Sequence, residues 1–118
     1  MRTADAYAAG VSLSPECADP TGPRALRASA GAIFSVPLCA WDEAPEPKVA
    51  LVAHGGDALA GVQLEPPVTF LLGSEREGLP EDLVARSRKA SIPTPGEAES
   101  LNVAAAGAIA LYELWRRL

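Results

Sequence analysis

The chain has 118 residues, of which 48% are hydrophobic, and it carries a formal net charge of −5. This length predicts one domain, 1–118, with a single core, and no apolar run approaches the roughly 20 residues that a membrane span needs. The negative charge works against nucleic-acid binding by electrostatic attraction alone, and the single histidine, His54, excludes a metal site made of several imidazoles.

Two observations bear on the cell compartment. Cys17 and Cys39 form no C-x-x-C pair and belong to no cluster with histidine, so we expect reduced, structural thiols and no metal. The first residues, MRTAD, contain no basic region followed by an apolar one, which is what a signal peptide requires. We therefore expect a cytoplasmic protein.

The first predicted elements are short and separated by turn-forming residues. Residues 2–9 contain no helix breaker and predict a helix that Gly10 ends. Residues 10–14 alternate between apolar and polar side chains, which predicts a short strand. The stretch 15–23 is dense in turn formers, including three prolines, and predicts a loop.

A second helix is predicted over 23–32, because Pro23 suits the first helical position. The apolar, β-rich run 33–38 favours extended structure. Residues 39–48 hold two prolines and three acidic residues, so no full helix fits before the next strand.

The second half of the chain alternates strands and helices. Residues 48–53 and 68–72 are continuous apolar runs, the pattern of strands buried on both faces of a parallel sheet. Pro80, at a first helical position, opens a helix over 80–88 with acids in its first turn and bases in its last, and a short strand follows at 89–92. This alternation predicts an α/β domain with an open, mostly parallel sheet and helices on both faces.

The last predicted helix begins at Ser100, a residue type that caps helices. Asn102 is a polar amide in the first turn of this alanine-rich helix, where it lowers helix propensity. Because Ser100 serves as the cap, we interpret Asn102 as a residue that contacts a ligand or braces the backbone. The small residues 104–108 let another element pack closely, as in a subunit interface or a tightly threaded core.

The turn between Gly73 and Gly78 is a candidate binding loop. Gly73 lets the chain leave its strand with little steric hindrance, and Gly78 permits a positive φ and close approach of a ligand. The turn's backbone groups suit an adenine or an amino-acid moiety, and an ordinary strand-to-helix connection is the alternative interpretation. The turn lacks G-x-G-x-x-G and a P-loop lysine, and Glu75 and Glu77 need not converge, so phosphate binding and paired-carboxylate chemistry are disfavoured.

This turn and the later strand-to-helix loop share their residue types and order with a known pattern, through the positions Gly73, Glu75, Gly78, Leu79, Ile92, Pro93, Ser100, Leu101, Asn102 and Val103. The combination resembles motifs 2 and 3 of the SpoU/TrmH family of RNA ribose 2′-O-methyltransferases. Residues 2–6 resemble the end of motif 1, and residues 13–34 resemble the segment between motifs 1 and 2. The motif-1 Asn and Gly are not in the chain, so we expect it to lack the first strand and most of the first helix of the catalytic domain.

The resemblance implies a C-terminal deep trefoil knot, a homodimer with the final helix in its interface, and S-adenosylmethionine bound in the knot. The positions that it implies for cofactor binding are Leu72, Gly73, Glu75, Gly78, Ile92 and Leu101. It also implies that Ala53, His54 and Gly55 lie at the edge of the adenine.

The implied reaction is methyl transfer to a ribose 2′-hydroxyl of RNA, with ribosomal RNA favoured over transfer RNA. Arg2 matches the motif-1 arginine, and because a guanidinium is a very poor base, we expect it to stabilise the developing alkoxide. In the implied catalytic set, Ser100 and Asn102 orient Arg2 or the ribose. The resemblance also implies that Arg24 and Arg27 hold RNA phosphates.

Two alternatives stay open. A truncated, catalytically inactive dimeric domain would bind S-adenosylmethionine and transfer no methyl group. A flavodoxin-like or Rossmann nucleotide-binding enzyme is the other, and the lack of a glycine-rich first strand-to-helix turn counts against it.

Overall fold

The computed structural model describes residues 1–15, 21–74, 77–96 and 100–118. The chain forms two compact units, Met1–Ala44 and Pro45–Leu118. Cys17 and Glu75 lie outside the described residues.

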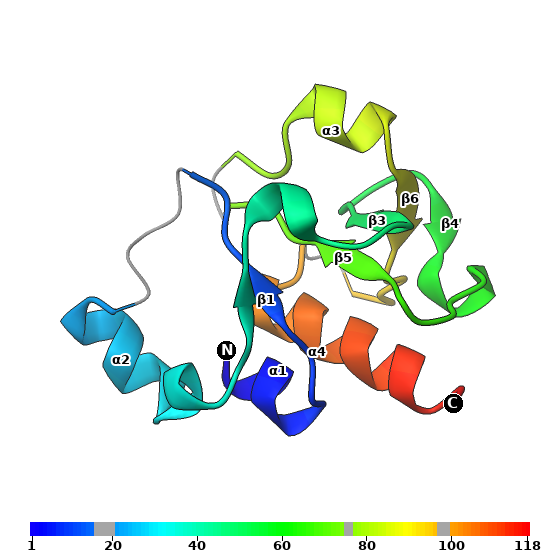
Figure 1. Ribbon diagram of the computed structural model, residues 1–118. Coiled ribbons are helices and arrows are strands. Elements are labelled where there is room, and N and C mark those ends of the chain that lie inside the picture. The colour runs from blue at the N-terminus through cyan, green and yellow to red at the C-terminus, as the bar shows by residue number, and fades with distance from the viewer. Residues whose placement is uncertain (16–20, 75–76, 97–99) are drawn as a thin grey trace. The chain divides into compact units, whose positions relative to one another are not determined.

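The Met1–Ala44 unit combines short helices with a two-stranded parallel sheet (Figure 1). Its elements in chain order are α1 (Arg2–Ala6), β1 (Val11–Ser12), α2 (Pro23–Ser29), the 3-10 helix η1 (Ala32–Phe34), β2 (Leu38–Cys39) and the 3-10 helix η2 (Trp41–Glu43). Val11 pairs with Leu38, and Ser12 pairs with Cys39. The core of this unit consists of Ala4, Ala32 and Val36, against which Met1, Ala9 and Val11 pack.

Both helices of this unit end earlier than the sequence predicts. The helix predicted over 2–9 stops at Ala6, because Ala8 takes a left-handed conformation with φ 54° before Gly10 is reached. Pro23 lies in the first turn of α2 as predicted, but left-handed Ala30 and Gly31 end that helix at Ser29. The residue types do not predict these helix ends, because alanine is a strong helix former. The ends are set by the left-handed backbone conformation of Ala8, Ala30 and Gly31.

The apolar run 33–38 is not the extended segment that its composition favours. Its first residues belong to η1, and only Leu38 is in a strand. Ala32 and Val36 are both buried, and the amide of Val36 donates to the carbonyl oxygen of Ala32 at 2.9 Å. A spacing of four residues between buried positions is helical, which explains the difference.

The Pro45–Leu118 unit contains a four-stranded sheet in which every pairing is parallel, with the order β4-β6-β3-β5. Its elements are β3 (Lys48–Leu51), β4 (Asp57–Ala58), the 3-10 helix η3 (Leu59–Gly61), β5 (Thr69–Leu71), α3 (Glu81–Ala85), β6 (Arg88–Ser91) and α4 (Val103–Trp115). The predicted strands at 48–53 and 68–72 are confirmed with shorter bounds, and the strand predicted at 89–92 is confirmed with a shift of one residue toward the N-terminus. The α/β class with parallel pairing is confirmed as well.

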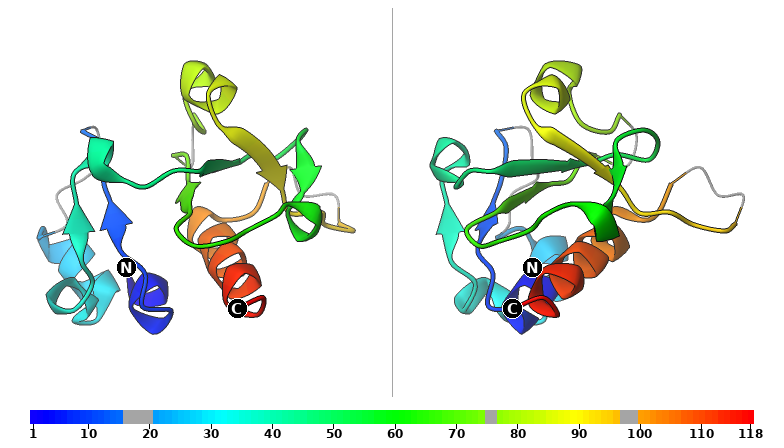
Figure 2. Two further views of the ribbon diagram at one scale, coloured as in Figure 1. Left: turned by 45° about the vertical axis from the view of Figure 1, so that its right-hand side comes forward. Right: turned by 90° about the vertical axis from the view of Figure 1, so that its right-hand side faces the viewer.

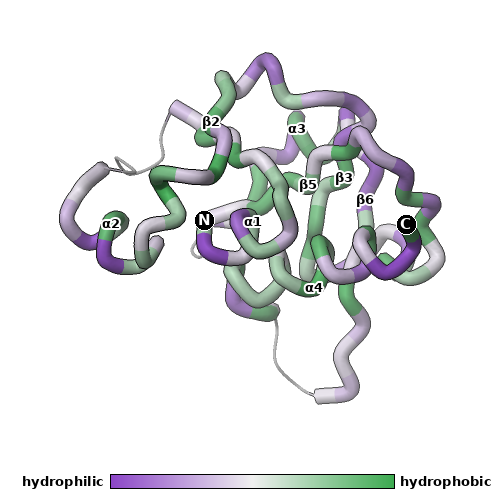
Figure 3. Tube along the Cα trace, turned by 60° about the horizontal axis from the view of Figure 1, so that its bottom comes forward, coloured by the Kyte–Doolittle hydropathy of each residue, from purple (hydrophilic) through white to green (hydrophobic). Residues whose placement is uncertain are grey.

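Helices α3 and α4 lie on opposite sides of this sheet (Figures 1 and 2). The tube view shows β3 and β5 as hydrophobic (Figure 3). The core residues come from the strands, from the segment around η3 and from α4: Val49, Leu59, Val62, Leu64, Ala90 and Ala110. Burial of these apolar side chains holds α4 against the sheet.

The start and end of α3 differ from the prediction. Pro80 is the residue before the helix and not its first helical residue. The helix ends at Ala85, so the basic residues expected in its last turn lie beyond it, with Arg86 as the C-terminal cap and Arg88 in β6. The acids Glu81 and Asp82 do occupy the first turn, as predicted.

The C-terminal end of α4 is tied to the segment around η3 by Arg117. Its guanidinium donates to the backbone carbonyl oxygens of Leu59, Ala60 and Val62. Arg116 and Arg117 both pair with Glu113, at 2.7 and 2.6 Å. Hydrogen bonds from Arg116 and then Arg117 lower the pKa of Glu113 below its ordinary value.

Among the described helices, none has both the length and the apolar character required to cross a bilayer.

Candidate functional site

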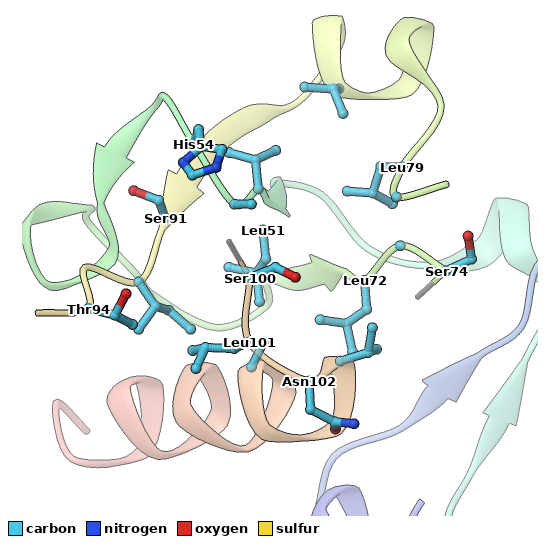
Figure 4. A pocket seen from close by; sticks show the side chains of 18 of the residues that line it. Leu51, His54, Leu72, Ser74, Leu79, Ser91, Thr94, Ser100, Leu101 and Asn102 are labelled. Atoms are coloured by element: carbon cyan, nitrogen blue, oxygen red, sulfur yellow. The ribbon is translucent and has the colours of Figure 1, made fainter. Parts of the chain in front are cut away.

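A cavity of about 910 Å³ opens in the Pro45–Leu118 unit, where three parallel strands end. The loops that leave β3, β5 and β6 supply most of its walls, and the rest comes from the last residues of β3 and β6, from Val84 and from the first turn of α4. Figure 4 shows Leu72 and Leu101 over the first turns of α4, with His54 and Ser91 across the cavity from them. Ligands of open α/β sheets bind at this carboxyl edge.

The turn after β5 is held in a conformation that requires glycine at position 73. A β-carbon there would lie 2.5 Å from the amide nitrogen of Leu79 and would also overlap the backbone of Gly78. The amide of Gly78 donates to the carbonyl oxygen of Ser74 at 3.1 Å, and the amide of Glu77 donates to Ser74 Oγ at 3.0 Å. Gly78 has φ 68°, in agreement with the positive φ that a glycine at this position permits.

The loop between β6 and α4 brings further predicted residues into the cavity wall, namely Ile92, Ser100, Leu101 and Asn102. The prediction that Ser100 caps the last helix is wrong. Asn102 is the cap: its Oδ1 accepts the amide hydrogens of Ala104 and Ala105, at 2.9 and 3.3 Å. Capping therefore accounts for an asparagine at this position, and the inference of a ligand role from a position already capped no longer holds.

The described part of the cavity wall carries little charge. Among the lining residues that the structure describes, Glu77 is the one with a formal charge at neutral pH, and His54 is the other titratable group. An uncompensated carboxylate repels phosphate and attracts a cation. The wall therefore favours a neutral, zwitterionic or cationic ligand over a polyphosphate.

Five of the six residues predicted to bind the cofactor line the cavity, and the sixth is not described by the structure. Leu72, Gly73, Gly78, Ile92 and Leu101 all line the cavity, whereas Glu75 lies outside the described residues. The wall also includes three residues that no sequence pattern singled out, namely Leu51, Val84 and Ser91. The expectation that strand ends converge at one sheet edge is the signal that finds Leu51 and Ser91.

The three predicted arginines belong to the Met1–Ala44 unit. Arg2 begins α1, and Arg24 and Arg27 lie on α2. All three are exposed, and no ion pair is found for them within the described ranges. Of the predicted catalytic set, the structure brings Ser100 and Asn102 together in the wall of the cavity.

The described residues contain no group of three or more His, Cys, Asp or Glu side chains that is able to hold a metal ion.

Comparison with known proteins gives consistent matches. The chain is 31% identical to an uncharacterized tRNA/rRNA methyltransferase of Synechocystis, over 99% of this chain and 47% of the relative. It is also 31% identical to the 23S rRNA (uridine(2479)-2′-O)-methyltransferase of Streptomyces viridochromogenes, with the same coverage. The crystal structure of an AdoMet-bound rRNA methyltransferase from Sinorhizobium meliloti superposes with a TM-score of 0.89 and 34% identity, over 99% of this chain and 49% of that one.

The chain thus spans about half the length of these relatives. The model of the SpoU rRNA Methylase family matches residues 1–112, which is nearly the whole chain. The cavity-lining loops at the strand ends, the parallel sheet and these matches agree, and the chain belongs to the SpoU rRNA methylase family.

Proposed function

We propose that the cavity binds S-adenosylmethionine and that the chain contributes it to an enzyme that methylates ribose 2′-hydroxyls of RNA. The observation that carries this proposal is the position of the cavity at the carboxyl ends of β3, β5 and β6, beside the start of α4. The rRNA methyltransferase of Sinorhizobium meliloti, whose crystal structure contains bound AdoMet, supports it by similarity of fold.

The residues of the cavity fit this cofactor. A volume of about 910 Å³ accommodates a nucleoside with an amino-acid arm. A β-carbon at Gly78 would meet no atom within 4 Å, so a ligand can approach the backbone there closely, and Glu77 suits a ligand with positive charge. Bound S-adenosylmethionine would supply an electrophilic methyl group on a sulfonium sulfur.

The protein's own residues would bind and orient the reactants. Leu72, Ile92 and Leu101 supply apolar surface at the cavity wall, suited to the adenine or the methylene groups. Ser100 offers a hydroxyl, and Arg2 would stabilise the negative charge that develops on the ribose oxygen. Arg2 would not act as the base, because its guanidinium stays protonated at neutral pH.

The RNA, the dimer and the knot are parts of the same proposal. Arg24 and Arg27 would hold RNA phosphates, and ribosomal RNA is favoured over transfer RNA. A homodimer through α4 is supported by the exposed apolar side chains of that helix, and a trefoil knot in the C-terminal segment is supported by the similarity to SpoU structures. We also propose that the protein acts in the cytoplasm.

Calorimetric titration with S-adenosylhomocysteine tests the cavity. We expect saturable binding to the chain and no binding of ATP, whose phosphates meet Glu77 and no cation in the described wall. Binding of ATP with no binding of S-adenosylhomocysteine would refute the proposal. Transfer of a labelled methyl group to ribosomal RNA then separates an active enzyme from an inactive cofactor-binding domain, since only the first incorporates label.

A further inference from the structure

Phe34 is an aromatic side chain in an unusual position. It is 90% exposed, whereas its neighbours Ala32 and Val36 on the same turn are 4% and 6% exposed. The turn therefore buries its small residue and presents its largest one to solvent. Folding by itself favours the opposite arrangement, because burial of an aromatic ring removes more apolar surface from water than burial of alanine.

The element that carries Phe34 is fixed on both sides. Ser35 Oγ donates to Asp5 Oδ1 of α1 at 2.7 Å, and Ala32 and Val36 share a core cluster with Ala4 of that helix. On the other side η1 contacts α2, from which the chain arrives through left-handed Ala30 and Gly31. Phe34 is thus held on a turn that packs against two helices.

These two helices carry all the arginines of the Met1–Ala44 unit. Arg24 and Arg27 are three residues apart on α2 and so lie on the same side of it. Both are exposed, as is Arg2 of α1, and none of the three has an ion-pair partner in the part of the chain that the structure describes.

The cations of the other unit are arranged differently. The described basic side chains that form ion pairs there are Lys48, Arg86, Arg88, Arg116 and Arg117, whereas Lys89 forms none. Among the described residues, the arginines without an ion pair are therefore concentrated on the two helices that flank Phe34. The described acids of the Met1–Ala44 unit are Asp5, Asp42 and Glu43. Asp5 accepts a hydrogen bond from Ser35, and Asp42 and Glu43 lie on η2.

We propose that Phe34, Arg24 and Arg27 form a surface for single-stranded RNA, with an unpaired base stacked on the Phe34 ring and phosphates held by the two arginines. This inference rests on the proposed RNA substrate and specifies its form. Charge complementarity favours RNA over an apolar protein partner, since the surface combines exposed cations with one aromatic face. A base inside a duplex is already stacked on its neighbours, so the surface selects loops and single strands.

The test measures binding of a fluorescent oligouridylate of about 12 nucleotides to the chain and to variants at position 34. Phe34→Ala is expected to weaken binding by about five- to one-hundredfold, the effect of losing one stacked base. Phe34→Trp should retain binding, because tryptophan also offers an aromatic face. Binding of inorganic polyphosphate, which has no bases, should be the same for the chain and for Phe34→Ala.

Two further variants test the arginines. Arg24→Ala and Arg27→Ala should each reduce the slope of log affinity against log salt by about 0.7. Arg86→Ala is the matched control, because Arg86 is already paired with Asp82, and its slope should be unchanged. An RNA duplex of the same length should bind the chain more weakly than the single strand.

Several outcomes overturn the inference. Equal affinity of the chain and Phe34→Ala for oligouridylate refutes the stacking role. A loss of oligouridylate affinity in Phe34→Trp as large as that in Phe34→Ala refutes it as well. Loss of self-association in Phe34→Ala with unchanged RNA binding identifies a second copy of the chain as the occupant. Each of these results leaves S-adenosylhomocysteine binding untouched, so failure here is distinguishable from failure of the proposed cofactor site.

Discussion

The side chain of Leu72 lies directly against the backbone of Gly107. A β-carbon at position 107 would come within 3.1 Å of Leu72 Cδ1. Leu72 lines the cavity at the end of β5, and Gly107 lies in α4. The absence of a side chain at Gly107 therefore makes the room in which Leu72 forms part of the cavity wall.

Gly107→Ala should separate stability from binding. Replacement of a mid-helix glycine by alanine raises helix stability by roughly 1 kcal/mol, so we expect an unchanged or higher melting temperature. The displaced Leu72 should enter the cavity and weaken S-adenosylhomocysteine binding about three- to tenfold. The double variant with Leu72→Ala should regain part of the loss, and calorimetry on the four proteins checks this. Parallel changes in stability and affinity would contradict the steric explanation.

Gly73→Ala should strongly weaken cofactor binding. The added methyl group overlaps the backbone of Gly78 and Leu79, and backbone atoms yield less readily than a side chain, so the turn must open. We expect more than about a tenfold loss of S-adenosylhomocysteine affinity. Gly61→Ala is the control, because a β-carbon at Gly61 meets no atom within 4 Å. Full binding by Gly73→Ala would show that this turn does not shape the site.

The cap formed by Asn102 predicts a graded series. Asn102→Ala removes the acceptor of the Ala104 and Ala105 amides and should lower the free energy of unfolding by about 1 kcal/mol. Asn102→Ser keeps a capping oxygen and should preserve stability. If Asn102 acts through the cap, S-adenosylhomocysteine affinity follows stability in both variants. A serine variant that is stable but binds poorly would instead indicate direct contact of the amide with the ligand.

Glu113 predicts a pH dependence of stability. Its pKa in the folded chain is lowered from 4.5, first by the hydrogen bond from Arg116 and then by the one from Arg117. A group with a lowered pKa stabilises the fold above its unfolded value and loses that contribution as the pH falls through the folded value. Glu113→Gln should thus lower the melting temperature at neutral pH, and the difference from the wild type should shrink below about pH 4.5. A difference that stays constant down to acidic pH would rule out this linkage.

The exposed side of α4 predicts self-association. Ile109, Tyr112 and Trp115 of α4 are 40% to 58% exposed and recur every three residues, and Leu118, beyond the end of the helix, is 78% exposed. Light scattering on the eluted chain should give the mass of a dimer, and Tyr112→Glu should give a monomer, because a charge in an apolar interface is costly to bury. Phe34→Ala is the control, since Phe34 belongs to the other unit, and it should remain dimeric. A wild-type chain that is monomeric at all concentrations would contradict the dimer.

Local patterns predict some elements and not others. The strands at 48–53 and 68–72 are evident from their continuous apolar runs, because a strand buried on both faces needs apolar residues at every position. The cap of α4 was assigned to Ser100 instead of Asn102, because both residue types cap helices and the sequence does not show which one bonds to the free amides. The small residues 104–108 indicated close packing, but only the structure identifies Leu72 as the neighbour of Gly107.

The sequence by itself determined the α/β class, the parallel strands and the two loops that line the cavity, since these depend on the spacing of apolar residues, on turn-forming residues and on likeness to a family. The tertiary structure decided where helices end, which glycine has no room for a side chain, and how Arg117 ties α4 to the segment around η3. Each of these depends on a contact between residues far apart in the chain or on a backbone angle at one residue. Neither is encoded in local composition.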